Sequence, residues 1–215
     1  MAGALAPIVA AVSGGPLRGL LDIAIEGYKQ LPGAKESAAA QLTKSGNHEA
    51  AINSLVLQHI ALAGAQGFVT NLGGFVTGLV AIPANIAGMA VIQCRMVAAV
   101  AHLRGYDLDD NRVRSAILAC LLGEKRVTEL IVEKKLPSTP LGIATAPMFD
   151  ADLDYKIAEY VMADVMTVAT GKRIGVLFTK KIPVVGGGVG LVVDGWGTQT
   201  VAKYARDQFR SRRVG

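Results

Sequence analysis

The longest uncharged stretch of the chain constrains most strongly what it can fold into. Residues 50–94 contain no Asp, Glu, Lys or Arg, a run of 45 residues. A run of this length holds two helices, with a turn at Gly73-Gly74 and a second arm that begins at Pro83. We therefore predict a central helical hairpin over about residues 50–104.

The glycines of this stretch predict close helix packing. Gly74 and Gly78 form a G-x-x-x-G pair, and small residues at this spacing let helix backbones approach closely in a bilayer or in a protein core. Residues 60–82 have the length of a membrane span, about 20 residues, but include four polar residues and five glycines. We expect a hairpin that is buried or that enters a bilayer only in part.

Helical spacing of apolar residues recurs along the rest of the chain. We predict an all-α, single-domain helical bundle built around the Gly/Ala-rich hydrophobic hairpin. An N-terminal apolar segment (1–15) precedes the helical domain (16–215). Further helices are expected from Pro16 to before Pro32, over 34–43, from near His48, from Asp109/Asp110 through 122 with a continuation over 124–135, over 150–169 and over about 190–213, with a loop at Pro137, Pro140 and Pro147.

Composition excludes several classes of protein. The chain is 51% hydrophobic and only 18% charged, which is the opposite of a disordered protein. Two cysteines, Cys94 and Cys120, cannot form a disulfide scaffold and have no metal-ligand spacing. No basic residue precedes the apolar N-terminal run, so a secretory signal is not expected. We expect a cytoplasmic protein.

Motifs for catalysis or cofactor binding fail at defined positions. The glycines at 186–190 do not complete G-x-G-x-x-G, and no Gly-Lys-Ser/Thr is present. Asp150, Asp152 and Asp154 resemble a calcium loop, but Tyr155 stands where that loop needs glycine. The histidines are scattered, and His59 is interpreted as a hydrogen-bonded core histidine. We expect no catalytic residue, no metal and no cofactor.

Positive charge is concentrated near the C-terminus. Residues 172–215 carry a formal charge of +7, whereas residues 1–171 carry −2. Basic residues spaced 3, 4 and 3 apart form one stripe of the last helix, and apolar residues form another. A basic amphipathic helix is typical of an anionic membrane surface. The alternative is a docked terminal helix whose cations are only solvated; nucleic acid is disfavoured, because no aromatics are interleaved with the basic residues.

These patterns give two sets of candidate site residues. The residues expected to contact an anionic surface are Lys180, Lys181, Lys203, Arg206, Arg210, Arg212 and Arg213. The residues expected to contact lipid are Phe68, Phe75, Leu79, Ile82, Val201, Tyr204 and Phe209.

Several short motifs occur in an order that resembles the EcsC protein family. They are G-F-V-T-N-L-G-G at 67–74, I-P-A-N at 82–85, Q-C-R-M at 93–96, A-H-L-R-G-Y-D at 101–107, the stretch 113–123, and K-I-P-V-V-G at 181–186. Asn71 stands where the family pattern has glycine. The resemblance covers roughly residues 20–210. It implies a bacterial, helical, hydrophobic protein and provides no catalytic residue or cofactor.

Together these features predict a non-catalytic protein at the cytoplasmic face of the inner membrane, peripheral or partly inserted. Its partner would be anionic lipid, with a membrane protein, a hydrophobic small molecule or a second copy of the chain as further partners. The alternative is a soluble helical module that binds a lipid or another hydrophobic ligand in an apolar cavity left by the Gly-rich hairpin.

Overall fold

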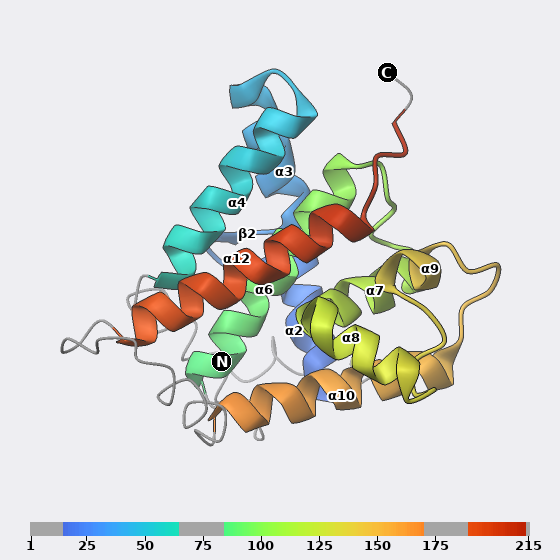
Figure 1. Ribbon diagram of the computed structural model, residues 1–215. Coiled ribbons are helices and arrows are strands. Elements are labelled where there is room, and N and C mark those ends of the chain that lie inside the picture. The colour runs from blue at the N-terminus through green and yellow to red at the C-terminus, as the bar shows by residue number, and fades with distance from the viewer. Residues whose placement is uncertain (1–14, 65–83, 170–188, 214–215) are drawn as a thin grey trace, which may run out of the picture.

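The computed structural model describes residues 15–64, 84–169 and 189–213. In these ranges the chain forms nine helices and one short hairpin, which confirms the predicted all-α single domain (Figure 1). The elements are α2 (Gly15–Glu26), β1 (Gly27–Tyr28), β2 (Leu31–Pro32), α3 (Ala34–Ser45), α4 (His48–Gly64), α6 (Ala84–Leu103), α7 (Asn111–Leu121), α8 (Gly123–Val132), α9 (Pro140–Ala144), α10 (Ala151–Ala169) and α12 (Val189–Gln208).

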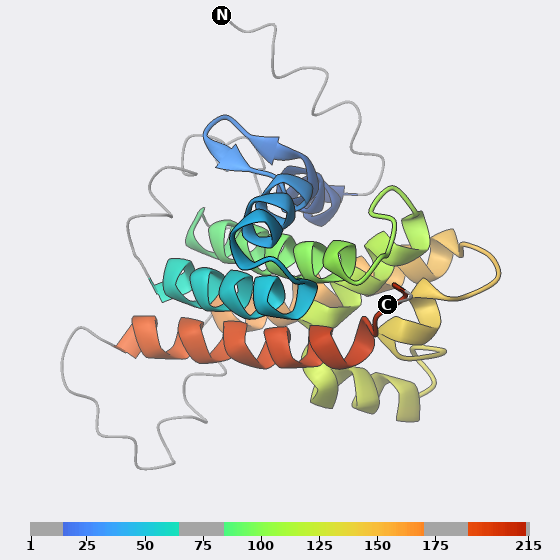
Figure 2. The same ribbon diagram turned by 90° about the horizontal axis from the view of Figure 1, so that it is seen from above.

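Helix α6 forms the centre of the domain. Helices α2, α3, α4, α7 and α12 all contact it, and Figure 2 shows α6 running between its neighbours. From Cys94 to Ala101, every side chain except that of Arg95 is completely buried. A helix that is apolar around its whole circumference is stable only inside a protein or a membrane. This burial accounts for the absence of Asp, Glu and Lys from α6, in which Arg95 is the single Arg.

The two helices expected to be the arms of the hairpin pack against each other. Helices α4 and α6 run side by side in opposite directions, and α12 lies across both (Figures 1 and 2). The predicted turn at Gly73-Gly74 lies outside the described residues. Helix α6 lies in the protein core, whereas α4 buries one face and exposes the other, with Leu57 68% exposed.

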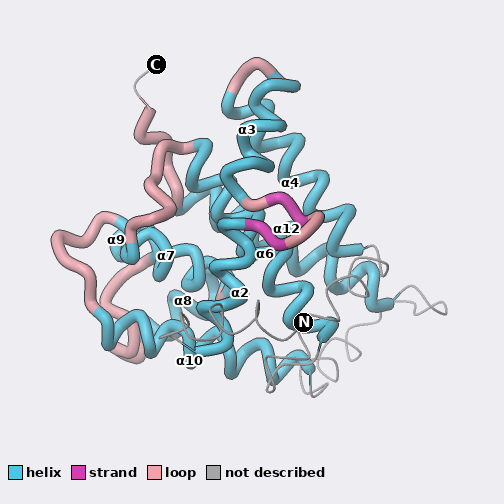
Figure 3. The backbone as a smooth tube through the Cα atoms, turned by 180° about the vertical axis from the view of Figure 1, so that it is seen from behind, coloured by secondary structure: helices cyan, strands magenta, loops and turns pink. Residues whose placement is uncertain are grey.

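A tight turn joins α2 to α3. The strands β1 and β2 pair antiparallel, with Gly27 opposite Pro32, and Figure 3 shows this small hairpin from behind. Gly27 has a φ of 88°, which side chains rarely adopt. A Cβ at Gly33 would lie 2.3 Å from the carbonyl oxygen of Ile25. Both glycines are therefore required for α3 to start this close to the end of α2.

The second half of the chain follows its predicted capping signals, with two differences. Asp110 accepts a hydrogen bond from the backbone N–H of Arg112 and caps α7 as expected. Gly123, with a φ of 74°, separates α7 from α8, where the sequence predicted an almost continuous helix. The proline-rich loop contains the short helix α9, whose first residue is Pro140 and whose cap is Thr139.

The last helix is shorter than the sequence predicted. Helix α12 ends at Gln208, whereas the basic pattern suggested a helix to about residue 213. The backbone N–H of Arg212 donates to the carbonyl oxygen of Arg104, 2.8 Å away, so the chain leaves the helix and follows the end of α6. The ring of Phe209 meets that of Tyr106 edge to face at 5.0 Å. These contacts replace the final helical turn.

The one charged side chain in the buried part of α6 is held by neutral acceptors. Arg95 is 3% exposed, and its Nε donates to Nε2 of His59 on α4 at 2.9 Å. Its guanidinium also donates to the carbonyl oxygen of Pro32 at 3.3 Å. The other ring nitrogen of His59, Nδ1, donates to the carbonyl oxygen of Leu55 at 2.8 Å. His59 is therefore the hydrogen-bonded core histidine that was predicted, and it must be neutral to accept from Arg95.

Two glycines provide a matched test of the packing. We expect Gly33→Ala to lower the free energy of unfolding by about 1–3 kcal/mol, because the new Cβ meets backbone atoms that cannot move aside. Gly197, in α12, has no atom within 4 Å of a built Cβ. Gly197→Ala should raise stability by about 0.5–1 kcal/mol through its better helix propensity. Urea unfolding would measure both; similar effects of the two changes would contradict this packing.

The His59–Arg95 contact predicts acid sensitivity. Burial and the adjacent Arg95 lower the pKa of His59 from 6.5 to about 4. The neutral ring is thus favoured in the fold, and its contribution to stability is complete above pH 6.5. As the pH falls toward 4, the free energy of unfolding drops by about 3 kcal/mol, because each unit of pKa difference corresponds to about 1.4 kcal/mol.

His59→Gln keeps an acceptor for Arg95 but does not titrate. We expect urea unfolding of this variant to depend less on pH between 4 and 6.5 than that of the wild type. His102→Gln is the control. His102 is also a histidine whose pKa is lowered chiefly by burial, but it is only half-buried, so this variant should change the pH dependence less. If the stability of His59→Gln depended on pH as strongly as that of the wild type, His59 would not be the source of the acid sensitivity.

Candidate functional site

The exposed cations of the C-terminal region form the first candidate site. Lys203 and Arg210 are exposed and form no ion pair with the described residues. Arg206 is half-buried, and its Nε has no hydrogen-bond partner in the described part of the chain. Because α12 ends at Gln208, Lys203 and Arg206 lie on the helix but Arg210 does not. The predicted single stripe of cations is therefore divided between a helix and the non-helical segment that follows it.

Arg212 and Arg213 belong to the same region but are held by the end of α6. The guanidinium of Arg212 lies over the ring of Tyr106, 4.5 Å from its centre. Arg213 donates from Nε to the carbonyl oxygen of Leu103 at 2.9 Å and from a terminal nitrogen to that of His102 at 3.2 Å. A cation at a helix C-terminus satisfies free carbonyls and interacts favourably with the helix dipole. These two charges have a structural role.

The apolar side of α12 corrects one expectation. Val201, Tyr204 and Phe209 are 6%, 5% and 0% exposed and are part of the main core. Burial also raises the pKa of the Tyr204 hydroxyl. In this structure these side chains are buried inside the domain, where α12 packs on α4, α6, α7 and α8. A lipid contact through them would require α12 to leave the domain.

The other predicted contact residues lie outside the described residues. These are Phe68, Phe75, Leu79 and Ile82 of the hairpin, and the basic pair Lys180 and Lys181. Within the described ranges, no helix combines the length and the apolar character needed to cross a membrane.

A second candidate site is a cavity of about 260 Å³ between α7, α9 and α10. Its wall includes Ile143, Ala146 and Leu153, and Met148 and Phe149 lie at it on the loop before α10. Met148 is 78% exposed and Phe149 41%, both unusually high for large apolar side chains. The cavity is thus bordered by apolar groups that water already reaches.

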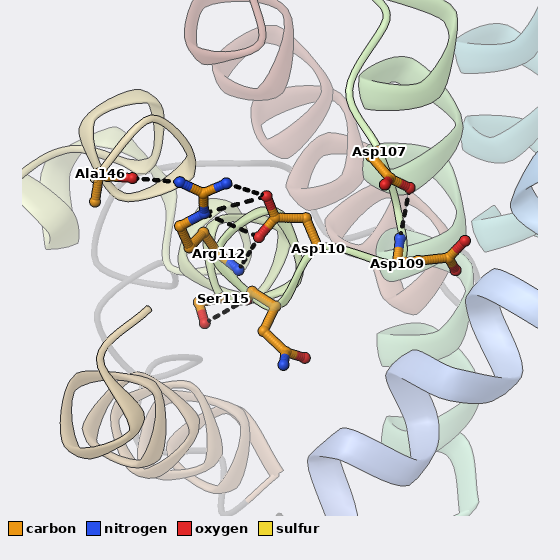
Figure 4. A network of polar contacts seen from close by, with 7 residues as sticks. Asp107, Asp109, Asp110, Arg112, Ser115 and Ala146 are labelled. Carbon is orange, nitrogen blue, oxygen red and sulfur yellow. Dashed lines mark hydrogen bonds and ion pairs between the residues drawn. The ribbon is translucent and has the colours of Figure 1, made fainter. Parts of the chain in front are cut away.

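The charged group beside this cavity is neutralised by its neighbours. Figure 4 shows Arg112 between Asp110 and the carbonyl oxygen of Ala146. Nε of Arg112 lies 3.0 and 3.1 Å from the two oxygens of Asp110, and a terminal nitrogen lies 2.5 Å from the Ala146 oxygen. The hydrogen bonds from Arg112 hold the pKa of Asp110 below its usual value. The pair therefore offers no net positive charge to a ligand.

The described residues provide little chemistry for metal binding or nucleophilic attack. No group of three or more His, Cys, Asp or Glu side chains gathers in the described ranges. Burial raises the pKa of the Cys94 thiol to about 12 and raises that of Cys120 as well. Both thiols stay protonated, so neither is an activated nucleophile.

Two features were not identified as sites from the sequence. The first is the cavity, for which the available signal was a Met-Phe pair next to prolines that were interpreted only as a loop. The second is the partner of Arg95. Its signal was the single charge at the end of a long uncharged run, with His59 on the facing arm.

Comparison with known proteins gives one match. The model of the EcsC protein family matches residues 27–129, from β1 into α8. No curated protein and no solved structure matches the chain. The matched part contains five of the six motifs that carry the resemblance; the sixth, at 181–186, lies outside it. This match over residues 27–129 confirms the resemblance to the EcsC protein family that the sequence motifs indicated.

Proposed function

We propose that this protein binds anionic membrane surfaces as a peripheral, non-catalytic protein at the cytoplasmic face of the inner membrane. The observation that carries the proposal is the exposure of Lys203 and Arg210 without a carboxylate partner in the described ranges. From Lys203 to Arg213 the chain has five cations and one acidic residue, Asp207. This excess of positive charge lies in one short segment beside the end of α6.

The contact is electrostatic. Each cation near an anionic bilayer contributes about 1 kcal/mol, and the attraction declines within about 10 Å at 0.1 M salt. Two or three available cations therefore give weak, reversible binding. Arg212 and Arg213 add less than their formal charge suggests, because they already interact with Tyr106 and with the carbonyl oxygens at the end of α6.

The hairpin is also part of this proposal, and only its sequence supports its inclusion. Phe68, Phe75, Leu79 and Ile82 would contact the acyl region, while Lys180 and Lys181 would add to the electrostatic attraction. Resistance of the native protein to carbonate extraction would support insertion of this segment. Release by carbonate would restrict the contact to the membrane surface.

Vesicle flotation tests the electrostatic contact. The double variant Lys203→Gln/Arg210→Gln removes two exposed cations that form no ion pair in the described structure. We expect its binding to phosphatidylglycerol-containing vesicles at low salt to fall by roughly ten- to thirtyfold, since two cations contribute about 2 kcal/mol and each 1.4 kcal/mol is a factor of ten.

The matched control removes the same charge elsewhere on the surface. Lys44 on α3 and Lys156 on α10 are exposed, and Lys44→Gln/Lys156→Gln should bind like the wild type. Equal binding of the wild type to pure phosphatidylcholine vesicles, or an equal loss in both double variants, would refute the proposal.

A further inference from the structure

The cavity between α7, α9 and α10 has the size and the wall of a site for a small apolar molecule. Its volume is about 260 Å³. A cavity of roughly 150 Å³ lined by aliphatic and aromatic side chains remains dry and binds benzene. The apolar part of the wall here is formed by Ile143, Ala146 and Leu153, with Met148 and Phe149 at the exposed margin; its polar part is formed by Arg112, Ser115, Ser138 and Asp150.

Three polar side chains of the wall, those of Arg112, Ser115 and Asp150, already have partners within the protein. Arg112 donates hydrogen bonds to the carboxylate of Asp110 and to the carbonyl oxygen of Ala146. Ser115 Oγ lies 2.5 Å from a carboxylate oxygen of Asp154, and that carboxylate pairs with Arg18 on α2. Asp150 accepts from the backbone N–H of Leu153 at the start of α10. No charged group of the wall therefore requires a ligand to satisfy it.

This charge balance defines the kind of ligand. Because Arg112 and Asp110 neutralise each other, the remaining formal charge of the wall is the carboxylate of Asp150. A negatively charged head group would be desolvated beside that carboxylate and would find no free cation. An uncharged alkyl chain has no charged group to desolvate, and the burial of its apolar surface favours binding.

We propose that this cavity binds one uncharged alkyl chain, such as that of a long-chain alcohol or a neutral lipid, which enters beside Met148 and Phe149. This site is separate from the basic C-terminal region and does not depend on the membrane proposal. It places the ligand between α7, α9 and α10, and not at the Gly-rich hairpin where the sequence suggested an apolar cavity.

The test uses the full chain in solution without vesicles, with 1-octanol as the probe. The protein carries ¹³C-methyl methionine, and the Met148 signal is assigned from its loss in Met148→Leu. When 1-octanol is titrated in, the Met148 signal should shift until it saturates. The Met96 signal should not move, because Met96 is fully buried in α6. Octanoate, which has the same chain length and a negative charge, should bind at least tenfold more weakly. Absence of a saturable Met148 shift, or octanoate binding as tightly as 1-octanol, would overturn the proposal.

Two variants locate the site. Ala146→Phe places a large side chain on the wall and should weaken 1-octanol binding at least tenfold, whereas Ala40→Phe on the exposed side of α3 should not. If Ala146→Phe does not fold, Phe149→Ser tests the same wall at a position 41% exposed, and binding should weaken severalfold. Unchanged affinity in the folded wall variant would show that the probe binds elsewhere.

Discussion

The structure depends on how one positive charge is accommodated at its apolar centre. Arg95 lies within the buried helix α6, and its described partners are the neutral ring of His59 and the carbonyl oxygen of Pro32. These bonds join α6 to α4 and to the turn before α3. Loss of one partner of a buried charge is strongly destabilising. The contact therefore fixes the position of α4 along α6. Helices α2, α3, α7 and α12 pack around this pair, whereas α8, α9 and α10 pack on α7 and its neighbours.

The sequence was sufficient for features determined by local chemistry. Asp110 marked the start of α7, and the predicted start near His48 and end near residue 169 agree with α4 and α10. It was not sufficient where distant contacts decide the outcome. The basic pattern after Gln208 continues without a helix-breaking residue, and only the contact of Phe209 with Tyr106 and the bond from Arg212 to Arg104 end the helix.

The same limitation applies to the candidate sites. Periodicity showed that α12 is amphipathic but could not show whether its apolar side meets lipid or protein; the structure places Val201, Tyr204 and Phe209 in the core. The exposed cations were found because charge can be counted along a sequence. The cavity was missed because its wall combines residues from three helices and two loops, and only the fold brings them together.

The position of α12 also determines when the domain can fold. Helix α12 packs on α4 and α6, and the core side chains of Tyr204 and Phe209 follow about a hundred residues after the end of α6. During synthesis, the apolar surface of α4 and α6 therefore stays uncovered until residue 209 has left the ribosome. Partly folded chains that expose such surfaces aggregate readily. Completion of this part of the core is thus a late event in the folding of the domain.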